Sequence, residues 1–131
     1  MKFLSQEWFD KHVEALNATF KDANRNNTEL VEVYENCWGE EGKTIWIYYQ
    51  MKDGLVGKCQ RGEGEDNMPE ATFRCFGEYD DYVLVAQGKL DPKKGLLTGK
   101  FTLEGNLVKA ISMLGTYMKV TECKRIDGMD Y

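Results

Sequence analysis

Residues 88–106 read GKLDPKKGLLTGKFTLEGN, and this stretch decides the organisation of the second half of the chain. Its first part contains Asp91 followed by Pro92, a pair typical of helix starts. The fixed φ of proline suits the first helical position, where no backbone N–H is needed. The sequence therefore predicts a short helical turn over 93–97.

The second part of the same stretch predicts a strand followed by a helix. Gly99 ends the turn, and residues 100–104 alternate so that Phe101 and Leu103 lie on one side of a strand. Asn106 then precedes a long run rich in apolar residues, and its side chain can accept a hydrogen bond from a free N–H of the first helical turn. The predicted order is turn, strand and closing helix.

The closing helix, predicted over 107–123, carries more apolar surface than one sheet can cover. Its polar side chains occupy an arc of only about 80°, and its apolar ones spread over about 240°, although about 100° suffices for packing on a sheet. The surplus face can pack against another helix, form a dimer contact or line an apolar cavity. The flexible side chains of Met113 and Met118 suit either a cavity or an irregular core.

The first residues predict an amphipathic helix from Ser5 to about Asp22. Ser5 is a good N-cap, and Glu7 is favourably placed in the first turn against the helix dipole. His12 lies in the middle of the apolar arc. We interpret it as a neutral, hydrogen-bonded core residue without a chemical role.

The middle of the chain predicts four strands and one helix. Val31, Val33 and Cys37 share one face of the first strand, whereas the second strand is apolar on both faces. A turn of the Asp-Gly type joins the second and third strands into a hairpin. The predicted strands cover 28–38, 43–51, 55–60 and 71–76, and the predicted helix covers 78–87.

These elements predict an α+β fold in which residues 1–131 form one domain. The sheet is expected to have five strands and to be mostly antiparallel, with a three-strand meander and two further strands, and helices are expected to cover it.

Charge and length exclude several classes of function. The 131 residues include 17 basic and 22 acidic side chains, a formal net charge of −5, so the chain lacks the basic surface that nucleic-acid binding requires. The same acidity leaves at most a transient membrane contact through a local basic patch. No apolar run approaches the about 18 residues of a membrane span, and no signal peptide is evident, so we expect a soluble, cytoplasmic protein.

Residues that could carry chemistry are few. The chain lacks the G-x-S-x-G, phosphate-loop and H-E-x-x-H motifs. The four cysteines form no C-x-x-C pair, so we interpret them as reduced thiols and expect no metal site. Pairing of His12 with a cysteine stays the one enzymatic alternative. We therefore expect a protein that is not an enzyme and has no catalytic residue or cofactor. The cysteines are Cys37, Cys59, Cys75 and Cys123.

The segments 88–92 and 97–106, followed by an apolar helix, resemble the sterol carrier protein family. In that family a Gly-Lys-apolar-polar-apolar-x-Gly stretch is the last strand, entered after a short proline-initiated turn and followed by the closing helix. The opening residues 3–8 also resemble the start of small stand-alone bacterial or archaeal members. The likeness is strongest over 73–118.

This resemblance implies a five-stranded sheet with helices on one side and an apolar tunnel between them that holds lipid-like molecules. The family has no catalytic residues to carry over. By position, the resemblance implies these ligand-binding tunnel residues: Phe76, Tyr82, Val83, Leu90, Leu97, Phe101, Leu103, Leu107, Ile111, Leu114 and Met118.

Two hypotheses of function follow. The first is a non-enzymatic carrier that encloses a fatty acid, acyl chain, sterol or isoprenoid-like ligand, with burial of apolar surface as the driving force. The second is an interaction module in which the surplus face of the closing helix forms a homodimer or binds a partner enzyme. Both a monomer and a homodimer are compatible with the sequence.

Overall fold

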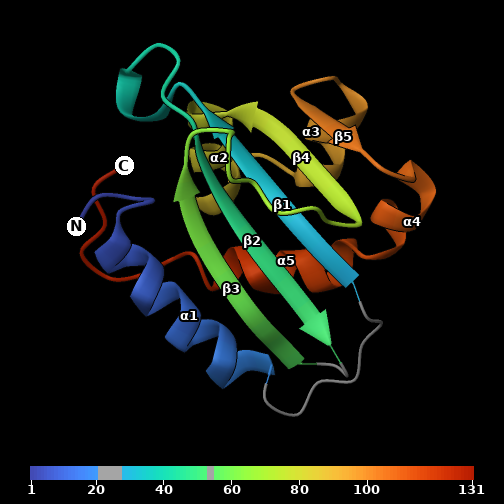
Figure 1. Cartoon of the computed structure of the whole chain (residues 1–131), viewed down its shortest axis with the longest axis horizontal. Helices are drawn as coiled ribbons and strands as arrows, with labels where there is room; N and C mark the ends of the chain where they lie inside the picture. The colour runs from blue at the N-terminus through green and yellow to red at the C-terminus, as the bar shows by residue number, and fades with distance from the viewer. Residues whose placement is uncertain (21–27, 53–54) are drawn as a thin grey trace.

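The computed structural model describes residues 1–20, 28–52 and 55–131, and Figure 1 shows how they are arranged. The expected α+β architecture is confirmed. In chain order the elements are α1 (Gln6–Phe20), β1 (Thr28–Glu35), the 3-10 helix η1 (Cys37–Gly39), β2 (Ile45–Lys52), β3 (Leu55–Glu63), β4 (Phe73–Glu78), α2 (Tyr79–Ala86), α3 (Pro92–Leu97), β5 (Phe101–Glu104), α4 (Leu107–Ser112) and α5 (Leu114–Glu122).

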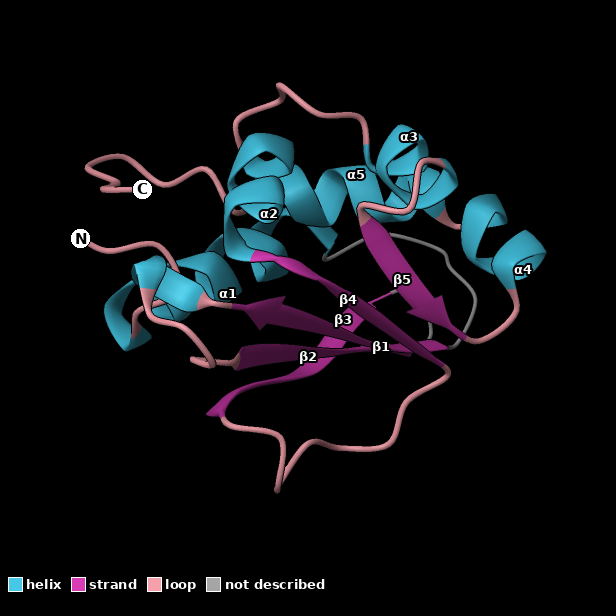
Figure 2. Cartoon of the chain, turned by 90° about the horizontal axis from the view of Figure 1, so that it is seen from above, coloured by secondary structure: helices cyan, strands magenta, loops and turns pink. Residues whose placement is uncertain are grey.

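The five strands form one mixed sheet in the order β3-β2-β1-β4-β5. β1, β2 and β3 make the predicted antiparallel meander, β4 runs parallel to β1, and β5 pairs antiparallel with β4. In the middle of the sheet, Val33 of β1 is opposite both Trp46 of β2 and Phe76 of β4. The helices α1, α2, α3 and α5 gather on one face of this sheet (Figure 2).

The two apolar faces of β2 pack into two different clusters. Ile45, Ile47 and Tyr49 face the helices and belong to the main core. Trp46 and Tyr48 face the other way and pack with valines of β1 and with partly buried residues of the 64–72 connection. A strand apolar on both faces is therefore explained by cover on both sides of the sheet.

Helix α1 is anchored to the end of α5. Ser5 caps α1 as predicted, because its Oγ accepts a hydrogen bond from Trp8 N at 3.2 Å. The Trp8 indole N–H donates to the Lys124 carbonyl at 2.9 Å, and His12 Nδ1 lies 2.7 Å from the Cys123 carbonyl. These carbonyls lie at the C-terminal end of α5, where no intrahelical donor remains for them. Two side chains of α1 thus complete the hydrogen bonds of α5.

The prediction extended the first strand too far. β1 ends at Glu35, because Asn36 takes a left-handed conformation with φ 53° and starts η1. Cys37 consequently packs in the main core and donates through Sγ to the Tyr34 carbonyl at 3.2 Å. Val31 and Val33 lie on the opposite face, so Cys37 does not share their side of the sheet.

Other boundaries shift by a few residues. β3 continues to Glu63, three residues beyond the predicted end, and β4 covers Phe73–Glu78 rather than 71–76. The predicted Asp53-Gly54 turn and the predicted break at 24–27 lie outside the described residues. The expected helical turn after Asp91-Pro92 is α3, and Asp91 caps it, with its Oδ1 accepting from Lys93 N at 2.9 Å.

The predicted single closing helix is in fact two helices. α4 ends at Ser112, and α5 begins at Leu114, with Met113 at φ −99° and ψ 2° between them. The Ser112 hydroxyl donates to the Lys109 carbonyl at 2.6 Å, and Met113 N bonds to the Ala110 carbonyl in an i to i−3 pattern that tightens the end of α4. The prediction treated α4 and α5 as one continuous helix. The break at Met113 separates their apolar faces, which explains why the apolar residues covered such a wide arc.

The ring of Phe101 fills a slot between two glycines. A Cβ added to Gly77 of β4 would lie 2.3 Å from Phe101 Cδ1, and a Cβ added to Gly95 of α3 would lie 2.5 Å from Phe101 Cδ2. These distances are well inside van der Waals contact, so the ring holds β5 and α3 together only while both positions lack side chains.

Replacing Gly95 with alanine tests this slot. Gly95→Ala is expected to destabilise the protein by about 1–3 kcal/mol, because the new methyl group forces the Phe101 ring to move. The matched control is Gly115→Ala in α5, where nothing lies within 4 Å of an added Cβ and where alanine favours the helix. Urea unfolding measures both. Equal stability of the two variants would contradict the slot.

Candidate functional site

A cavity of about 70 Å³ lies between the sheet and the helices. Strands β1, β4 and β5 form its floor, and α2, α3, α4 and α5 form its walls. It is lined by Thr28, Leu30, Phe73, Cys75, Tyr82, Pro92, Leu96, Phe101, Leu103, Ala110, Met113, Leu114, Thr116 and Tyr117.

The lining is almost entirely apolar, and its polar groups are mostly occupied. The Tyr82 hydroxyl donates to the Cys75 carbonyl at 2.7 Å, so the ring rather than the oxygen is presented to the cavity. Thr28 is 6% exposed, and its Oγ1 has no hydrogen-bond partner among the described residues. Such a surface favours hydrocarbon over charged or strongly hydrated ligands.

A buried polar cluster lies next to the cavity. Alternate residues of a strand share a face, so Glu32 follows the cavity residues Thr28 and Leu30 along the inner side of β1. Glu32 is fully buried and accepts three hydrogen bonds. The donors are the Tyr34 hydroxyl at 2.9 Å, Lys124 Nζ at 2.5 Å and the Tyr117 hydroxyl.

These partners keep Glu32 ionised. Burial alone would raise the pKa of Glu32, but the Lys124 charge and the three hydrogen bonds outweigh burial and lower the pKa below its usual value. Lys124 is itself 1% exposed, and its Nζ lies 5.3 Å from the ring centre of Tyr117. Its ammonium group therefore gains attraction from an aromatic face as well as from a carboxylate.

His12 is a structural residue. Its Nδ1 donates to the Cys123 carbonyl, which can only accept, so Nε2 accepts from the Tyr49 hydroxyl at 2.8 Å. Burial lowers the pKa of His12 from 6.5 to about 4, so the ring is neutral at physiological pH. Both nitrogens are occupied, and the contact to Cys123 is through its carbonyl, so His12 does not activate that thiol.

Three of the four cysteines lie where burial disfavours the nucleophilic thiolate. All four are free thiols, as the sequence indicated. Burial raises the pKa of Cys37 and of Cys75 to about 11 and that of Cys59 to about 12, so these thiols are protonated at neutral pH. Among the residues that the structure describes, no group of three or more His, Cys, Asp or Glu side chains could hold a metal ion.

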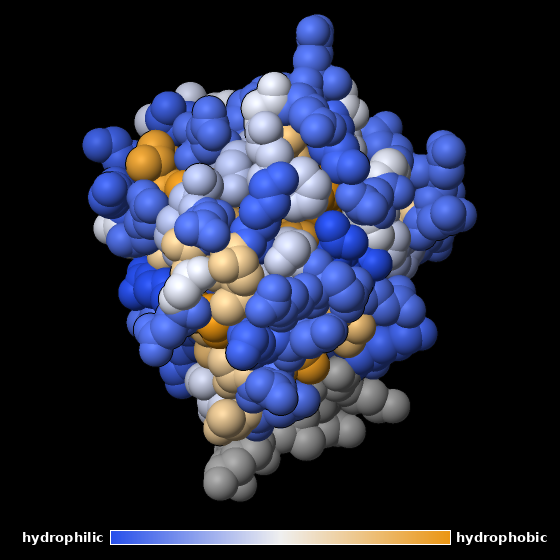
Figure 3. Space-filling view, turned by 90° about the vertical axis from the view of Figure 1, so that its left-hand side faces the viewer, coloured by the Kyte–Doolittle hydropathy of each residue, from blue (hydrophilic) through white to orange (hydrophobic). Residues whose placement is uncertain are grey.

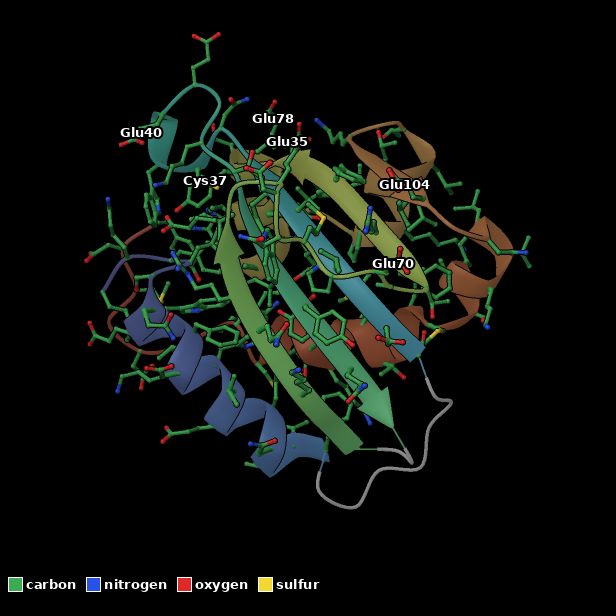
Figure 4. The ribbon with its side chains drawn as sticks, in the orientation of Figure 1. Glu35, Cys37, Glu40, Glu70, Glu78 and Glu104 are labelled. Atoms are coloured by element: carbon green, nitrogen blue, oxygen red, sulfur yellow. The ribbon has the colours of Figure 1, made fainter. Side chains whose placement is uncertain are left out.

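A pair of carboxylates lies at one end of the sheet. Glu35 and Glu78 are register partners at the ends of β1 and β4, where several of the labelled side chains gather (Figure 4). Burial, followed by the charge of Glu78, raises the pKa of Glu35. The Asn36 amide donates to both Glu78 oxygens at 2.9–3.0 Å. Neither carboxylate lines the cavity, so the pair adds nothing to it.

Four of the predicted tunnel residues line the cavity: Tyr82, Phe101, Leu103 and Leu114. The structure does not bring the other seven to it. Val83 and Leu90 pack against the main core. Leu97, Leu107 and Met118 are exposed, and Ile111 is half-buried. Whether the four bind a ligand stays a prediction.

Phe76, another of the predicted tunnel residues, lies on the other side of the sheet from the cavity. In β4 the inner face carries Phe73 and Cys75, whereas Arg74 and Phe76 point to the other face, and Phe76 packs with the outer cluster. The alternation of a strand places neighbouring side chains on opposite faces. Arg74 and Phe76 are two residues apart, so a strand places both on the same face. The charge of Arg74 was the sequence signal that this face points away from the cavity.

Sequence reasoning also missed several lining residues. Thr28, Leu30 and Tyr117 were not predicted, nor was Leu96, whose neighbour Leu97 was chosen instead. Two adjacent leucines on a short helix differ by about 100° in direction, and sequence alone does not say which one faces inward. Met113 and Ala110 were missed because the break between α4 and α5 was not foreseen.

Solved structures share this arrangement of sheet and helices. A sterol carrier protein 2 crystal structure superposes with a TM-score of 0.72 at 19% identity, covering 93% of this chain and 96% of that one. A conserved hypothetical protein of Thermus thermophilus, considered a candidate sterol carrier protein, gives 0.74 at 18% identity over 93% and 87%. The chain has the sterol carrier protein fold. Palmitated SCP2L2 from Aedes aegypti shares this fold with a TM-score of 0.53 at 11% identity, over 86% and 93% of the two chains.

The curated relatives are longer proteins. Hydroxysteroid dehydrogenase-like protein 2 of Pongo abelii is 30% identical over 86 residues, which are 66% of this chain and 19% of that protein. The human protein of the same name is 29% identical over 86 residues, again 66% of this chain and 19% of that protein. The match thus spans about a fifth of these relatives. No family model matches the sequence.

A helix that crosses a bilayer must be both long and apolar. Within residues 1–20, 28–52 and 55–131 no helix of this sterol carrier fold combines the length and apolar character needed to cross a membrane.

Titration of the single histidine tests its buried position. We expect the His12 ring to titrate near pH 4 rather than near its usual 6.5, because burial disfavours the imidazolium. NMR of the ring protons measures this without overlap, since the chain has one histidine. As the pH falls, His12 is protonated in the unfolded chain near pH 6.5 but in the folded chain only near pH 4. The free energy of unfolding therefore decreases by on the order of 3 kcal/mol between these pH values. A midpoint above 6 would contradict the buried site.

Removal of the buried cation tests the polar cluster. Lys124→Met is expected to lower the free energy of unfolding by about 3–5 kcal/mol, because Glu32 would be left as an unpaired buried charge. Adding Glu32→Gln should recover part of the loss. Lys43→Met is the control, because Lys43 pairs with Glu63 at the surface at 3.0 Å and should matter much less. Urea unfolding measures the free energy of unfolding of both lysine variants. An equal decrease in the two would refute the role of the cluster.

Proposed function

We propose that the chain binds a lipid-like apolar ligand, such as a fatty acid, acyl chain or isoprenoid-like molecule, between the sheet and the helices. The observation that carries the proposal is the apolar cavity walled by Leu30, Phe101 and Leu114 together with the rings of Tyr82 and Tyr117. The fold supports it, since one structure with this fold is a palmitated protein. Burial of ligand hydrocarbon contributes about 25 cal/mol per Å².

Ligand entry requires the cavity to expand. A volume of about 70 Å³ is well below the about 300–1,000 Å³ of sites for small organic molecules. α4 is the element best suited to move, because it has no buried side chain, and displacing it breaks little packing. Ala110 and Met113, at the cavity side of α4, would then border the enlarged space.

An interaction module is the second candidate function. It is favoured by the exposed apolar side chains of α4, where Val108 is 78% exposed and Leu107 is 44% exposed. In this case the apolar face would bind a second copy or a partner enzyme, and the cavity would stay closed. Sedimentation velocity distinguishes a homodimer from a monomer.

Native mass spectrometry of the purified protein tests the carrier function without a guess about the ligand. The expected result is a mass above 15.1 kDa by a few hundred daltons, with an adduct that organic solvent extracts as a fatty acid or another lipid. A bare chain that also refuses a fluorescent fatty-acid probe would overturn the proposal and favour the interaction module.

Filling the cavity tests where the ligand binds. Ala110→Trp is expected to weaken binding of a fluorescent fatty-acid probe at least tenfold, because the indole would occupy the space beside Leu103 and Leu114. Val108→Trp is the matched control on the same helix, since Val108 points to solvent and should leave the affinity unchanged. Probe titration measures both. Equal affinities in the two variants would place the ligand elsewhere.

A further inference from the structure

The end of the molecule that carries α3 and α4 exposes large apolar side chains. Leu97 at the end of α3 is 62% exposed, and Leu107 and Val108 at the start of α4 are 44% and 78% exposed. Figures 1 and 2 both place α3 and α4 at the same end of the molecule, joined by β5. We call Leu97, Leu107 and Val108, with the lysines named below, the α3–α4 surface. Large apolar side chains exposed at one end of a molecule are candidates for a contact site.

Positive charge accompanies these apolar side chains. Residues 89–119 contain six lysines and two acids, Asp91 and Glu104, so their net charge is +4. Because the whole chain has a net charge of −5, the other 100 residues carry −9. Lys93 and Lys94 on α3 and Lys109 on α4 are exposed. Lys100 lies 3.8 Å from Asp81, so its charge is partly matched within the chain. This segment of the sequence is therefore basic, although the net charge of the chain is negative.

Among the described residues, α1 at the opposite end of the molecule carries mainly polar and acidic side chains on its exposed face. Seen from the side of the chain termini and α1, the surface is mainly hydrophilic, with narrow apolar patches between polar residues (Figure 3). The exposed face of α1 carries Glu7, Asp10 and Glu14. Of the two ends, the α3–α4 surface is therefore the one where exposed apolar and basic side chains are described together.

We propose that the α3–α4 surface docks on an anionic lipid bilayer. Apolar side chains enter the headgroup region while flanking lysines pair with anionic lipid, a combination typical of helices that lie in the membrane interface. α3 and α4 have six residues each, so the contact is shallow. Val108 and Leu107 insert, and Lys93, Lys94 and Lys109 remain at the headgroups.

Charge argues for a bilayer rather than a second copy of the chain. In a symmetric dimer the same surface patch faces itself, so Lys93, Lys94 and Lys109 of one copy would approach those of the other. Like charges facing each other oppose association, whereas an anionic bilayer attracts all three. Docking also brings lipid to the side of the molecule where Leu96 and Ala110 line the cavity. The docking itself does not depend on a ligand in that cavity.

Vesicle flotation of the full chain tests the docking. The protein is expected to float with vesicles of phosphatidylcholine and about 30 mol% phosphatidylglycerol and not with pure phosphatidylcholine, and added salt should release it. Leu97→Ser and Val108→Ser should each weaken partitioning about tenfold. Lys93→Gln and Lys109→Gln should each weaken it about fivefold.

Matched controls lie at the other end of the molecule. Tyr131→Ser removes an exposed aromatic ring at the C-terminus, and Lys11→Gln removes an exposed charge from α1. Both should float like the parent. The proposal is overturned if the parent binds neither vesicle, if the controls lose as much as the α3–α4 variants, or if sedimentation shows a dimer that Val108→Ser dissociates. A chain that docks but carries no extractable lipid would refute the carrier function alone.

Discussion

The contact between Glu32 and Lys124 is the interaction on which the rest of the structure depends. A carboxylate in the middle of β1, with no exposed surface, would be strongly unfavourable without a matching cation and further donors. The cation comes from just beyond the last turn of α5, 92 positions later, and the donors come from Tyr34 and Tyr117. This one charge therefore sets where the end of α5 lies over the sheet. It also sets where α1 lies, because Trp8 and His12 bond to the carbonyls at that same end.

The cavity borders this arrangement. The polar cluster holds α5 through Tyr117 and through Lys124 just beyond its C-terminal end, and the cavity lies beside the cluster, over Leu30 of the same strand. At the other end of the closing segment α4 has no buried side chain. One end of the helical wall is thus held by a buried ion pair, whose disruption costs about 3–5 kcal/mol, and the other end is held by little. Any opening of the cavity therefore begins at α4 rather than at α5.

Local patterns predicted the elements of this fold, and long-range contacts account for what they missed. Ser5 and Asn106 were recognised as caps because a cap depends on bonds within one helical turn. Glu32 could not be recognised as a buried residue, because a charge between two valines reads as solvent-facing unless its partner is known. The split at Met113 was hidden for a related reason, since the apolar residues of α4 and α5 are equally compatible with one long helix. Of the candidate site, Phe101 and Leu103 were found because the predicted strand already placed them on one face. Thr28 and Leu30 were missed because the sequence of β1 does not show which of its faces borders the cavity.

Net charge illustrates the same limit for surfaces. A total of −5 argued against strong electrostatic attraction to anionic lipid and left a transient contact through a local basic patch, whose place the total does not reveal. Over distances longer than about 8–10 Å, salt screens one exposed group from another, so the acidic side chains of α1 hardly affect a surface at the far end of the molecule. At the end that carries α3 and α4, an approaching bilayer meets exposed Lys93, Lys94, Lys109 and Val108, together with the exposed Glu70 and Glu104 that Figure 4 labels there. The relevant quantity is therefore the charge within one screening length of the contact, and that quantity becomes known only once the fold places α3 beside α4.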